Sequence, residues 1–400
     1  MTRDDSPNAV RRTQSRRGAA MAAIAAAAAL AAAGCSGSPG GSAPAASGPG
    51  KPSTVSIDLT PQGCVPRPAK IPAGQVQFTV TNKDADAVSE AELRTFDLAK
   101  ILGEQENLTP GLSGGFSLDI QPGSYKINCP GAAQPHATFT VSGKSAGPAW
   151  QSNAQLSAAV RGYSRYIDQN AASLVTRTRE FCAAIRSGKL SRARLLYPQA
   201  RVYYERIEPV AEIWGNLDTQ IDGRWENPVT VKSQFIGFHR IEQLLWQDNT
   251  LAGAPAQCSG LVRHEQQLLT LVRGAQYNPL EMASGATDLI NEAATSKISG
   301  EEERYSNTDL PDFQANVDGA MEVVRLLRPY LQHSGTGLLT TIQRRDAAIG
   351  TQLARLEASP GYDGTGYTEY SAVGNGQRRQ LSAAVNALAE ALSGVSVRVS

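Results

Sequence analysis

The chain has 400 residues, of which 38 are Lys or Arg and 37 are Asp or Glu, so its formal net charge is +1. Residues 1–34 contain five Arg and two Asp, so the rest of the chain carries 1 − 3 = −2. Such a weakly acidic chain offers no basic field for nucleic acid, and we expect no nucleic-acid partner.

The N-terminal segment predicts export. Arginines precede an alanine-rich run, and together they predict a signal peptide over residues 1–34 rather than a membrane span. The run ends in Leu30-Ala31-Ala32-Ala33-Gly34-Cys35, which resembles a bacterial lipobox, in which Cys35 becomes the lipidated mature N-terminus. The Gly-, Ser-, Pro- and Ala-rich residues that follow cannot bury a core. We therefore expect residues 35–53 to form a lipid-anchored flexible tether on the outer face of the cytoplasmic membrane.

Residues 54–143 have the pattern of short β-strands. Apolar and polar residues alternate in four runs, and turn residues such as Pro122-Gly123 lie between such runs: Val55–Leu59, Val76–Val80, Phe116–Ile120 and Thr138–Val141. The pattern predicts a small antiparallel Greek-key β-sandwich of cupredoxin type.

Residues 144–400 have helical periodicity and predict an all-α bundle, so the chain is expected to be a multidomain β + α protein. Apolar residues from Leu156 to Ile185 form one long stripe that ends at Gly188. Pro209 is expected to kink its helix. Further helices are expected over about 191–214, 233–247, 255–274, 279–299, 311–333, 337–358 and 375–393.

Two helical segments carry candidate metal ligands. His239 and Glu242 are three residues apart and share one face of a helix, as do Glu205 and Glu208. Facing helices that each offer such a pair can build a carboxylate and imidazole site for iron or manganese. The alternative is that these carboxylates form solvated pairs with nearby arginines, and we favour ligands over such pairs.

Three sequence stretches carry a resemblance to a known family. Gly237–Glu242, of sequence GFHRIE, matches the H-x-x-E motif of the imelysin, or M75 peptidase-like, family, and Lys297–Ser306 and Asp312–Asn316 match a second stretch of it. The order of signal peptide, cupredoxin-like domain and imelysin-like domain resembles the EfeO-like lipoproteins of EfeUOB-type iron uptake systems. This resemblance implies capture of Fe²⁺ or Fe³⁺ for a membrane permease, with a secreted haem peroxidase as third component and no catalytic turnover.

The same resemblance implies a particular ligand set. The proposed metal site of the family falls on His239 and Glu242, with Glu205, Glu208 and Asp222 as acidic partners. One imidazole among carboxylates favours iron, manganese or zinc over calcium or magnesium.

Two other functions remain as alternatives. A zinc metallopeptidase-like hydrolase would use the H-x-x-E motif, although Gln243 stands where the inverted zinc motif requires a second histidine. A copper-binding protein would use the sandwich, although residues 54–143 contain His136 as their one histidine and no methionine.

Four cysteines follow Cys35, an even number in an oxidising compartment. They are Cys64, Cys129, Cys182 and Cys258. We expect Cys182 and Cys258 to form a disulfide. The first pair has two interpretations, which are a second disulfide or, as the resemblance implies, two thiolate ligands for Zn²⁺ or Cu²⁺ with Glu90 or Glu92 beside them.

The run Glu301-Glu302-Glu303 is expected to be a solvated helix end. Its alternative is an iron-loading surface or a contact for the permease, because it lies in the second stretch that matches the family.

Overall fold

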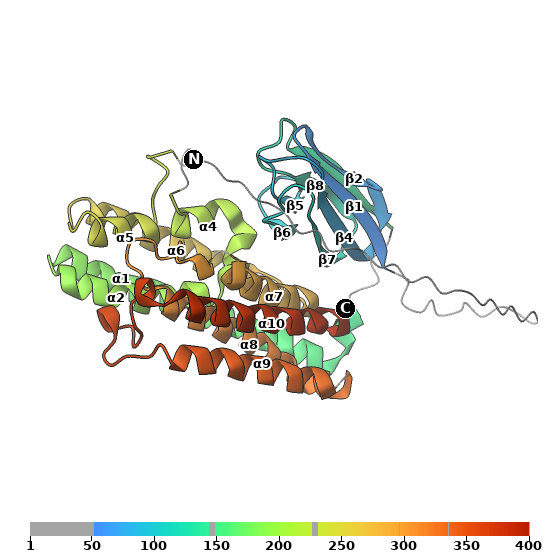
Figure 1. The fold of residues 1–400 in the computed structure, drawn as a ribbon. Helices are drawn as coiled ribbons and strands as arrows, with labels where there is room; N and C mark the ends of the chain where they lie inside the picture. Colours follow the sequence, from blue (N-terminus) through green and yellow to red (C-terminus); the bar gives the residue numbers. More distant parts are fainter. Residues whose placement is uncertain (1–51, 144–148, 226–230, 296, 335, 400) are drawn as a thin grey trace, which may run out of the picture. The chain divides into compact units, whose positions relative to one another are not determined.

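The computed structural model describes residues 52–143, 149–225, 231–295, 297–334 and 336–399. Strands come first and helices follow, which confirms the expected β-then-α fold class (Figure 1). The predicted signal peptide and the lipidation site at Cys35 lie outside the described residues, as does the tether except for its last two residues. Within the described ranges, no helix has the length and apolarity that a membrane crossing requires.

The sandwich consists of two sheets with the strand orders β2-β1-β4-β7 and β3-β9-β8-β5-β6. All four predicted runs are strands, and Val55, Ile57 and Leu59 alternate inward along β1. The nine strands are β1 Ser53–Thr60, β2 Gly63–Arg67, β3 Lys70–Pro72, β4 Gly74–Asn82, β5 Ala91–Thr95, β6 Ile101–Gln105, β7 Ser113–Ile120, β8 Gly123–Asn128 and β9 His136–Ser142.

The sandwich is mixed rather than purely antiparallel. Strand β1 pairs in parallel with β4, and β3 pairs in parallel with β9. The reason is the path of the chain, which leaves the first sheet for β3 in the second sheet and returns beside β1 in the original direction. Cys64 in β2 and Cys129 after β8 are joined by a disulfide, which ties the two sheets together.

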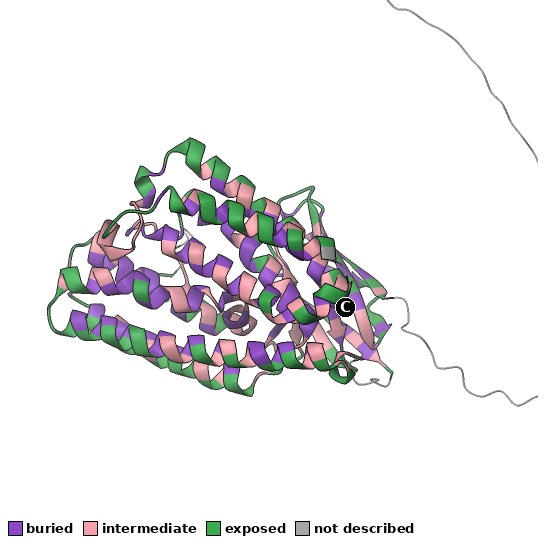
Figure 2. Ribbon diagram, turned by 90° about the horizontal axis from the view of Figure 1, so that it is seen from below, coloured by how far each residue is buried: buried purple, intermediate pink, exposed green. Residues whose placement is uncertain are grey.

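The bundle is built around the predicted apolar stripe. Buried residues follow one side of the first helix, and Figure 2 shows the same inward pattern on the long helices. A disulfide between Cys182 and Cys258 joins α1 to α6, as expected. The α-helices are α1 Ala154–Arg186, α2 Leu190–Glu205, α3 Glu208–Ala211, α4 Gly215–Asp222, α5 Phe238–Trp246, α6 Ala254–Gly274, α7 Pro279–Thr295, α8 Asp309–Ser334, α9 Thr336–Ala354 and α10 Asn375–Val399.

Three features of this bundle position the site. The predicted helix over 191–214 is broken between α2 and α3, with Pro209 in the first turn of α3, as its fixed φ requires. Helix α4 was not expected from the sequence. The helix expected from residue 233 begins at Phe238, because Gly237 has a φ of +85° that no helix contains.

Candidate metal centre

A cluster of acidic side chains lies inside the bundle, where α2, α3, α4 and α5 meet the segment 297–308 and the start of α8. Among the described residues its members include these carboxyl groups, each buried or nearly so: Glu205, Glu208, Asp222, Glu242, Glu302, Glu303, Asp309 and Asp312. All five bundle residues predicted from the sequence therefore belong to one cluster. Carboxylates removed from water repel one another unless cations compensate them.

The start of α5 brings His239 to this cluster. Gly237 lies against the end of α4, where a Cβ atom would come within 2.2 Å of the carbonyl oxygen of Ile221. Only glycine permits this approach together with a positive φ. The glycine of the GFHRIE sequence thereby places His239 beside Asp222, the last residue of α4.

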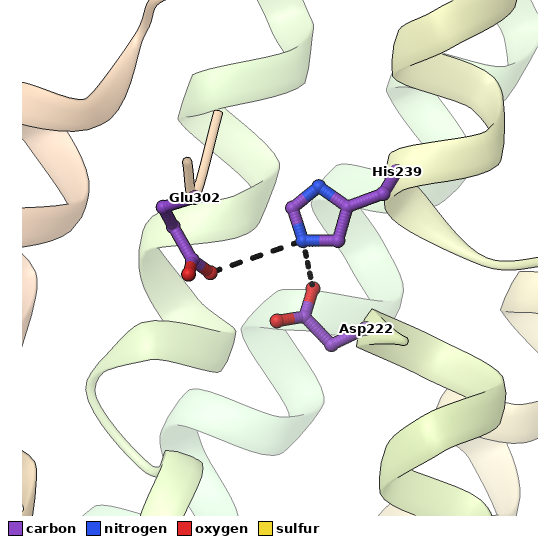
Figure 3. Close-up of side chains that lie close together, drawn as sticks. All are labelled: Asp222, His239 and Glu302. Atoms are coloured by element: carbon purple, nitrogen blue, oxygen red, sulfur yellow. Dashed lines mark ion pairs between the residues drawn. The ribbon is translucent and has the colours of Figure 1, made fainter. Parts of the chain in front are cut away.

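The imidazole of His239 is directed at two carboxylates. Its Nε2 atom lies 3.6 Å from Oδ1 of Asp222 and 3.8 Å from Oε1 of Glu302, and both side chains point at this one nitrogen (Figure 3). The ring is 2 % exposed. Within the described part of the chain, Nε2 has no hydrogen-bond partner. A buried nitrogen that faces two acceptors at these distances is suited to a metal ion lying between them.

Glu242 holds the other side of the ring. Its Oε2 atom lies 3.0 Å from Nδ1 of His239, while Oε1 accepts the backbone N–H groups of Tyr305 at 2.8 Å and Ser306 at 2.7 Å. A carboxylate on the second ring nitrogen fixes the tautomer and orientation of a metal-binding histidine. The i, i+3 spacing of the motif therefore creates contact between its own two residues.

Arg201 of α2 is the central cation of the cluster. Its guanidinium is fully buried and pairs with five of the carboxylates: Glu205, Asp222, Glu302, Glu303 and Asp312. Its fixed fork of donors suits several planar acceptors at once. Arg201 was not predicted as part of the site. Its i, i+4 spacing to Glu205 was a signal that could have found it, whereas its other partners lie 21 or more positions away.

Lys297 is the second buried cation. Its Nζ atom lies 2.7 Å from Glu205 and 2.6 Å from Glu208, and it is 1 % exposed. The two acidic residues predicted as ligands from the first helical pair are thus neutralised by a lysine of the chain. Asn316 adds a hydrogen bond to Glu205 at 3.0 Å.

The ionisation of the cluster is uneven. Burial and Arg201 lower the pKa of His239, but the carboxylates of Asp222 and Glu242 outweigh them and raise it to about 9. Burial raises the pKa of Glu302, yet the positive charges of Lys297, Arg224 and Arg201 lower it to about 2. Without metal the centre therefore contains an imidazolium beside an ionised carboxylate.

Other carboxyl groups of the cluster are protonated more easily. Burial, followed by the charge of a neighbouring carboxylate, raises the pKa of Glu208 and Glu303 well above the ordinary range. Burial also raises the pKa of Asp309 to about 7. A bound dication would favour the ionised forms and release protons.

A tight crevice, too narrow to admit water in this structure, adjoins the centre. Its lining includes His239, Glu242 and Glu302, together with Arg224, Trp225, Glu301, Arg304 and Tyr305. Arg224 pairs with Glu302, and Arg304 pairs with Glu301 at 2.7 Å.

Two of the acidic residues expected to form a solvated helix end, Glu302 and Glu303, are instead buried in the cluster, while Glu301 is exposed.

The structure contradicts the metal site expected in the sandwich. Cys64 and Cys129 are joined in a disulfide and offer no thiolates. Both oxygens of Glu92 are held by Arg94, at 2.6 and 2.7 Å, and one of them also by the amide of Asn128. Glu90 stands apart from these contacts, and burial followed by the charge of Glu92 raises its pKa to about 7. The expected ligand set is thus replaced by a disulfide and an ion pair.

The remaining histidines of the bundle are not part of the cluster. His264 on α6 lies near Arg263, and His333 on α8 is exposed with Nδ1 2.8 Å from the carbonyl oxygen of Pro329. In the described structure, His239 is therefore the one imidazole that contacts these carboxylates.

The fold and this cluster define a class of protein, a β-sandwich followed by a helical bundle with a buried centre of one histidine and several carboxylates. Family models agree with both parts. The imelysin model matches residues 159–395, and the cupredoxin-like domain model matches residues 20–141.

Individual relatives extend this match over most of the chain. It is 36 % identical over 342 residues to the iron uptake system component EfeO of Yersinia pseudotuberculosis serotype I (strain IP32953), covering 85 % of this chain and 89 % of that protein. It is 35 % identical over 343 residues to EfeO of Escherichia coli (strain K12), with the same coverage. The chain belongs to the imelysin family and, within it, to the EfeO-like proteins.

Proposed function

We propose that this protein captures iron in the helical bundle and delivers it to a membrane permease. The observation that carries the proposal is the buried Nε2 atom of His239, which faces Asp222 and Glu302 and has no hydrogen-bond partner in the described structure. The names of the EfeO relatives support iron as the cargo.

The distances suit a transition-metal ion. Metal–nitrogen and metal–oxygen bonds to such ligands measure about 2.0–2.2 Å, so separations of 3.6 and 3.8 Å between Nε2 and the two oxygens match one ion. Arg201 pairs with the same two oxygens and would have to release them to the ion. The imidazole favours Fe²⁺, Mn²⁺ or Zn²⁺, and the two carboxylates supply hard ligands that iron accepts. In this arrangement Glu242 orients His239 and raises its basicity, rather than binding the metal through both oxygens.

Release is part of the proposal. Arg201 and Lys297 compensate the negative charge of most of the carboxylates when metal is absent. Loss of the ion therefore does not leave unpaired buried charges that would destabilise the bundle. The crevice beside Glu301 is the proposed path for the ion, and its lining side chains must move apart to let the ion pass. Anchoring through Cys35 would keep the protein at the membrane near the permease, and the haem peroxidase of such systems would act as a separate component.

A binding role without turnover fits the described groups. A zinc hydrolase would take a second imidazole from the same helix, and α5 offers Gln243 there. Binding of metal together with peptide hydrolysis would favour the hydrolase, and copper bound by the sandwich would favour the third function.

Anaerobic calorimetric titration of the full chain with Fe²⁺ tests the proposal. We expect Asp222→Asn and Glu302→Gln to weaken binding by more than about 100-fold, and Glu242→Gln by about 10–100-fold, as orienting residues do. Glu180→Gln, at an exposed ion pair with Arg177, is the matched control and should bind as the wild type does. Wild-type affinity in Asp222→Asn and Glu302→Gln would refute the proposed centre.

A further inference from the structure

A second cation position lies beside the one at His239. Oxygen atoms of Glu205, Glu208, Asp222 and Glu302 come within 4.8 Å of one another, close enough to surround one ion. Asp222 and Glu302 belong both to this group and to the group around His239. The two positions therefore share ligands, as neighbouring metals do in carboxylate-bridged sites.

The ammonium of Lys297 lies among three of these four carboxylates. Nζ lies 2.7 Å from Oε2 of Glu205, 2.6 Å from Oε2 of Glu208 and 3.9 Å from Oε1 of Glu302. These atoms would need to move inward by only about 0.5 Å to reach metal–oxygen distances for the two nearest ligands. A cation tethered to the chain thus stands where a free dication would otherwise bind.

Asn316 provides an independent sign that the position is built for a cation. Its side chain is fully buried, its Nδ2 atom lies 3.0 Å from Oε2 of Glu205 and 3.4 Å from Oε2 of Glu208, and its Oδ1 atom has no partner in the described structure. Nδ2 also donates to the backbone oxygen of Glu205 at 3.0 Å. When a cation replaces these acceptors as the partner of the amide, a half-turn that gives up this bond would exchange the two atoms and direct a neutral oxygen at the same point. That oxygen would complete a set of ligands on the side away from Arg201, which holds Oε1 of Glu205 at 2.7 Å.

We propose that Lys297 limits the centre to one metal ion by occupying the second position with its own charge. This inference rests on the proposed binding of metal at His239. Removing the ammonium leaves Glu205, Glu208 and Asn316 facing an empty point. Glu302 lies beside that point and could bridge to the first metal by exchanging its contact with Arg201 for the ion. A single ion between His239, Asp222 and Glu302 is held by fewer bonds than a bridged pair, which suits a protein that must give its cargo up.

The test uses the full chain and Mn²⁺ under anaerobic conditions. Bound metal is counted after equilibrium dialysis, and electron paramagnetic resonance distinguishes isolated ions from a pair coupled through shared carboxylates. Lys297→Met should bind one Mn²⁺ more than the wild type and show a coupled spectrum. Lys297→Arg retains the positive charge and should match the wild type in both measurements.

Two outcomes overturn the inference. One is a folded Lys297→Met variant that holds the same number of ions as the wild type with an uncoupled spectrum. The other, which requires no variant, is a coupled pair in the wild-type protein at saturating Mn²⁺. Should Lys297→Met fold only when Mn²⁺ is present, the gain of one ion under that condition supports the inference. Should it fail to fold in either condition, the wild-type spectrum decides.

Failure of the inference differs from failure of the proposed function. If metal does not bind at His239, His239→Ala leaves the Mn²⁺ count of the wild type unchanged, and the function itself is refuted. If it does bind there, His239→Ala lowers the count, and the comparison with Lys297→Met concerns the second position alone. Adding Glu208→Gln to Lys297→Met should abolish the coupled spectrum, since it removes a ligand of that position.

Discussion

At the scale of single residues, and among the residues that the structure describes, His239 is the one nitrogen ligand in a cluster otherwise made of oxygen ligands. Nitrogen contributes most to binding of iron and zinc and least to binding of calcium, which prefers oxygen. Asp222, by contrast, contributes a charge that every dication uses.

We therefore expect His239→Ala to weaken Fe²⁺ and Zn²⁺ binding by about 100-fold while Ca²⁺ binding changes by less than about tenfold. Asp222→Asn should weaken all three. Competition titrations against a metal-sensitive dye give the three affinities for each variant. Equal losses for Ca²⁺ and Fe²⁺ in His239→Ala would show that the imidazole is not a ligand.

Another buried acidic residue, Glu265, lies outside the cluster. Glu265 of α6 is fully buried, accepts a hydrogen bond from the Thr178 hydroxyl at 2.7 Å, and has an Oε2 atom without a partner in the described structure. Burial raises the pKa of Glu265 well above its usual range, even though Thr178 and Arg179 act to lower it. The folded protein therefore favours the protonated form.

This shift predicts how stability depends on pH. Because the pKa of Glu265 is higher in the folded state, its contribution is fully present below the unfolded carboxyl pKa of about 4.3 and is lost as pH rises towards the folded value. Glu265→Gln removes the ionisation, so it should raise Tm at pH 8 and change it little at pH 4. Thermal melts across this range check the expectation, and an equal change in Tm at both pH values would contradict it.

At the scale of elements, the site depends on the contact between the end of α4 and the start of α5. Gly237 makes the contact possible, because a Cβ atom there would meet the backbone of Ile221 at 2.2 Å. Gly253, before α6, has nearly the same φ, +84° against +85°, but nothing within 4 Å of its Cβ position. The two differ in ψ, which is −23° at Gly253, in the left-handed helical region, and −158° at Gly237, in a region that essentially only glycine occupies. Gly253 is therefore a control for a positive φ alone.

Gly253→Ala should cost about 1–2 kcal/mol of stability, the price of a left-handed conformation. Gly237→Ala should cost more, because its ψ of −158° lies in a region that essentially only glycine occupies and because overpacking adds about 1–3 kcal/mol, and it should displace His239 from Asp222. Chemical denaturation and Fe²⁺ titration of both variants measure the two effects. We expect only Gly237→Ala to weaken iron binding, and equal iron affinities would show that the α4–α5 contact does not position His239.

The elements also show how far the sequence predicts this site. Periodicity located the pairs at Glu205 and Glu208 and at His239 and Glu242, because neighbours on one helix face are fixed by local geometry. It could have suggested the i, i+4 pair of Arg201 with Glu205, but not the contacts of Arg201 with Glu302 or of Lys297 with Glu208, since those join distant segments. Glu302 and Asp312 lie in stretches that match the family, but neither was predicted as a ligand. For Glu302 the reason is that a run of three acidic residues does not by itself show whether its side chains are buried or solvated.

The sandwich illustrates the same limit. Alternation identified four strands but missed short ones such as β3 and β6, whose few residues carry too little pattern. The even number of cysteines left two interpretations of Cys64 and Cys129. Whether these two form a disulfide depends on how closely the two sheets approach, which the sequence does not show.

At the scale of the whole molecule, each of the two disulfides lies within one part of the fold. Cys64–Cys129 spans 65 residues of the sandwich, and Cys182–Cys258 spans 76 residues of the bundle. Closing loops of this length restricts the unfolded chain by an amount worth about 4 kcal/mol for each bond.

Replacing Cys182 and Cys258 by Ser should therefore destabilise the bundle by about 4 kcal/mol and lower its Tm. In a Cys35→Ala background, thiol labelling of the denatured, unreduced protein should find no free thiol, and reduction should expose four. Detection of two reactive thiols before reduction would mean that one disulfide does not form in solution.

The backbone contacts of Glu242 have a consequence for following the centre in solution. The backbone N–H groups of Tyr305 and Ser306 donate hydrogen bonds to the carboxylate that contacts His239. Their proton resonances therefore report directly on the charge of that carboxylate. Loading the centre with a diamagnetic ion such as Zn²⁺ would draw electron density from the imidazole and, through it, from Glu242. In an NMR titration with Zn²⁺ these two amide signals would then shift together. A continuous shift would mean that metal exchanges quickly, and replacement of one set of signals by another would mean that it exchanges slowly.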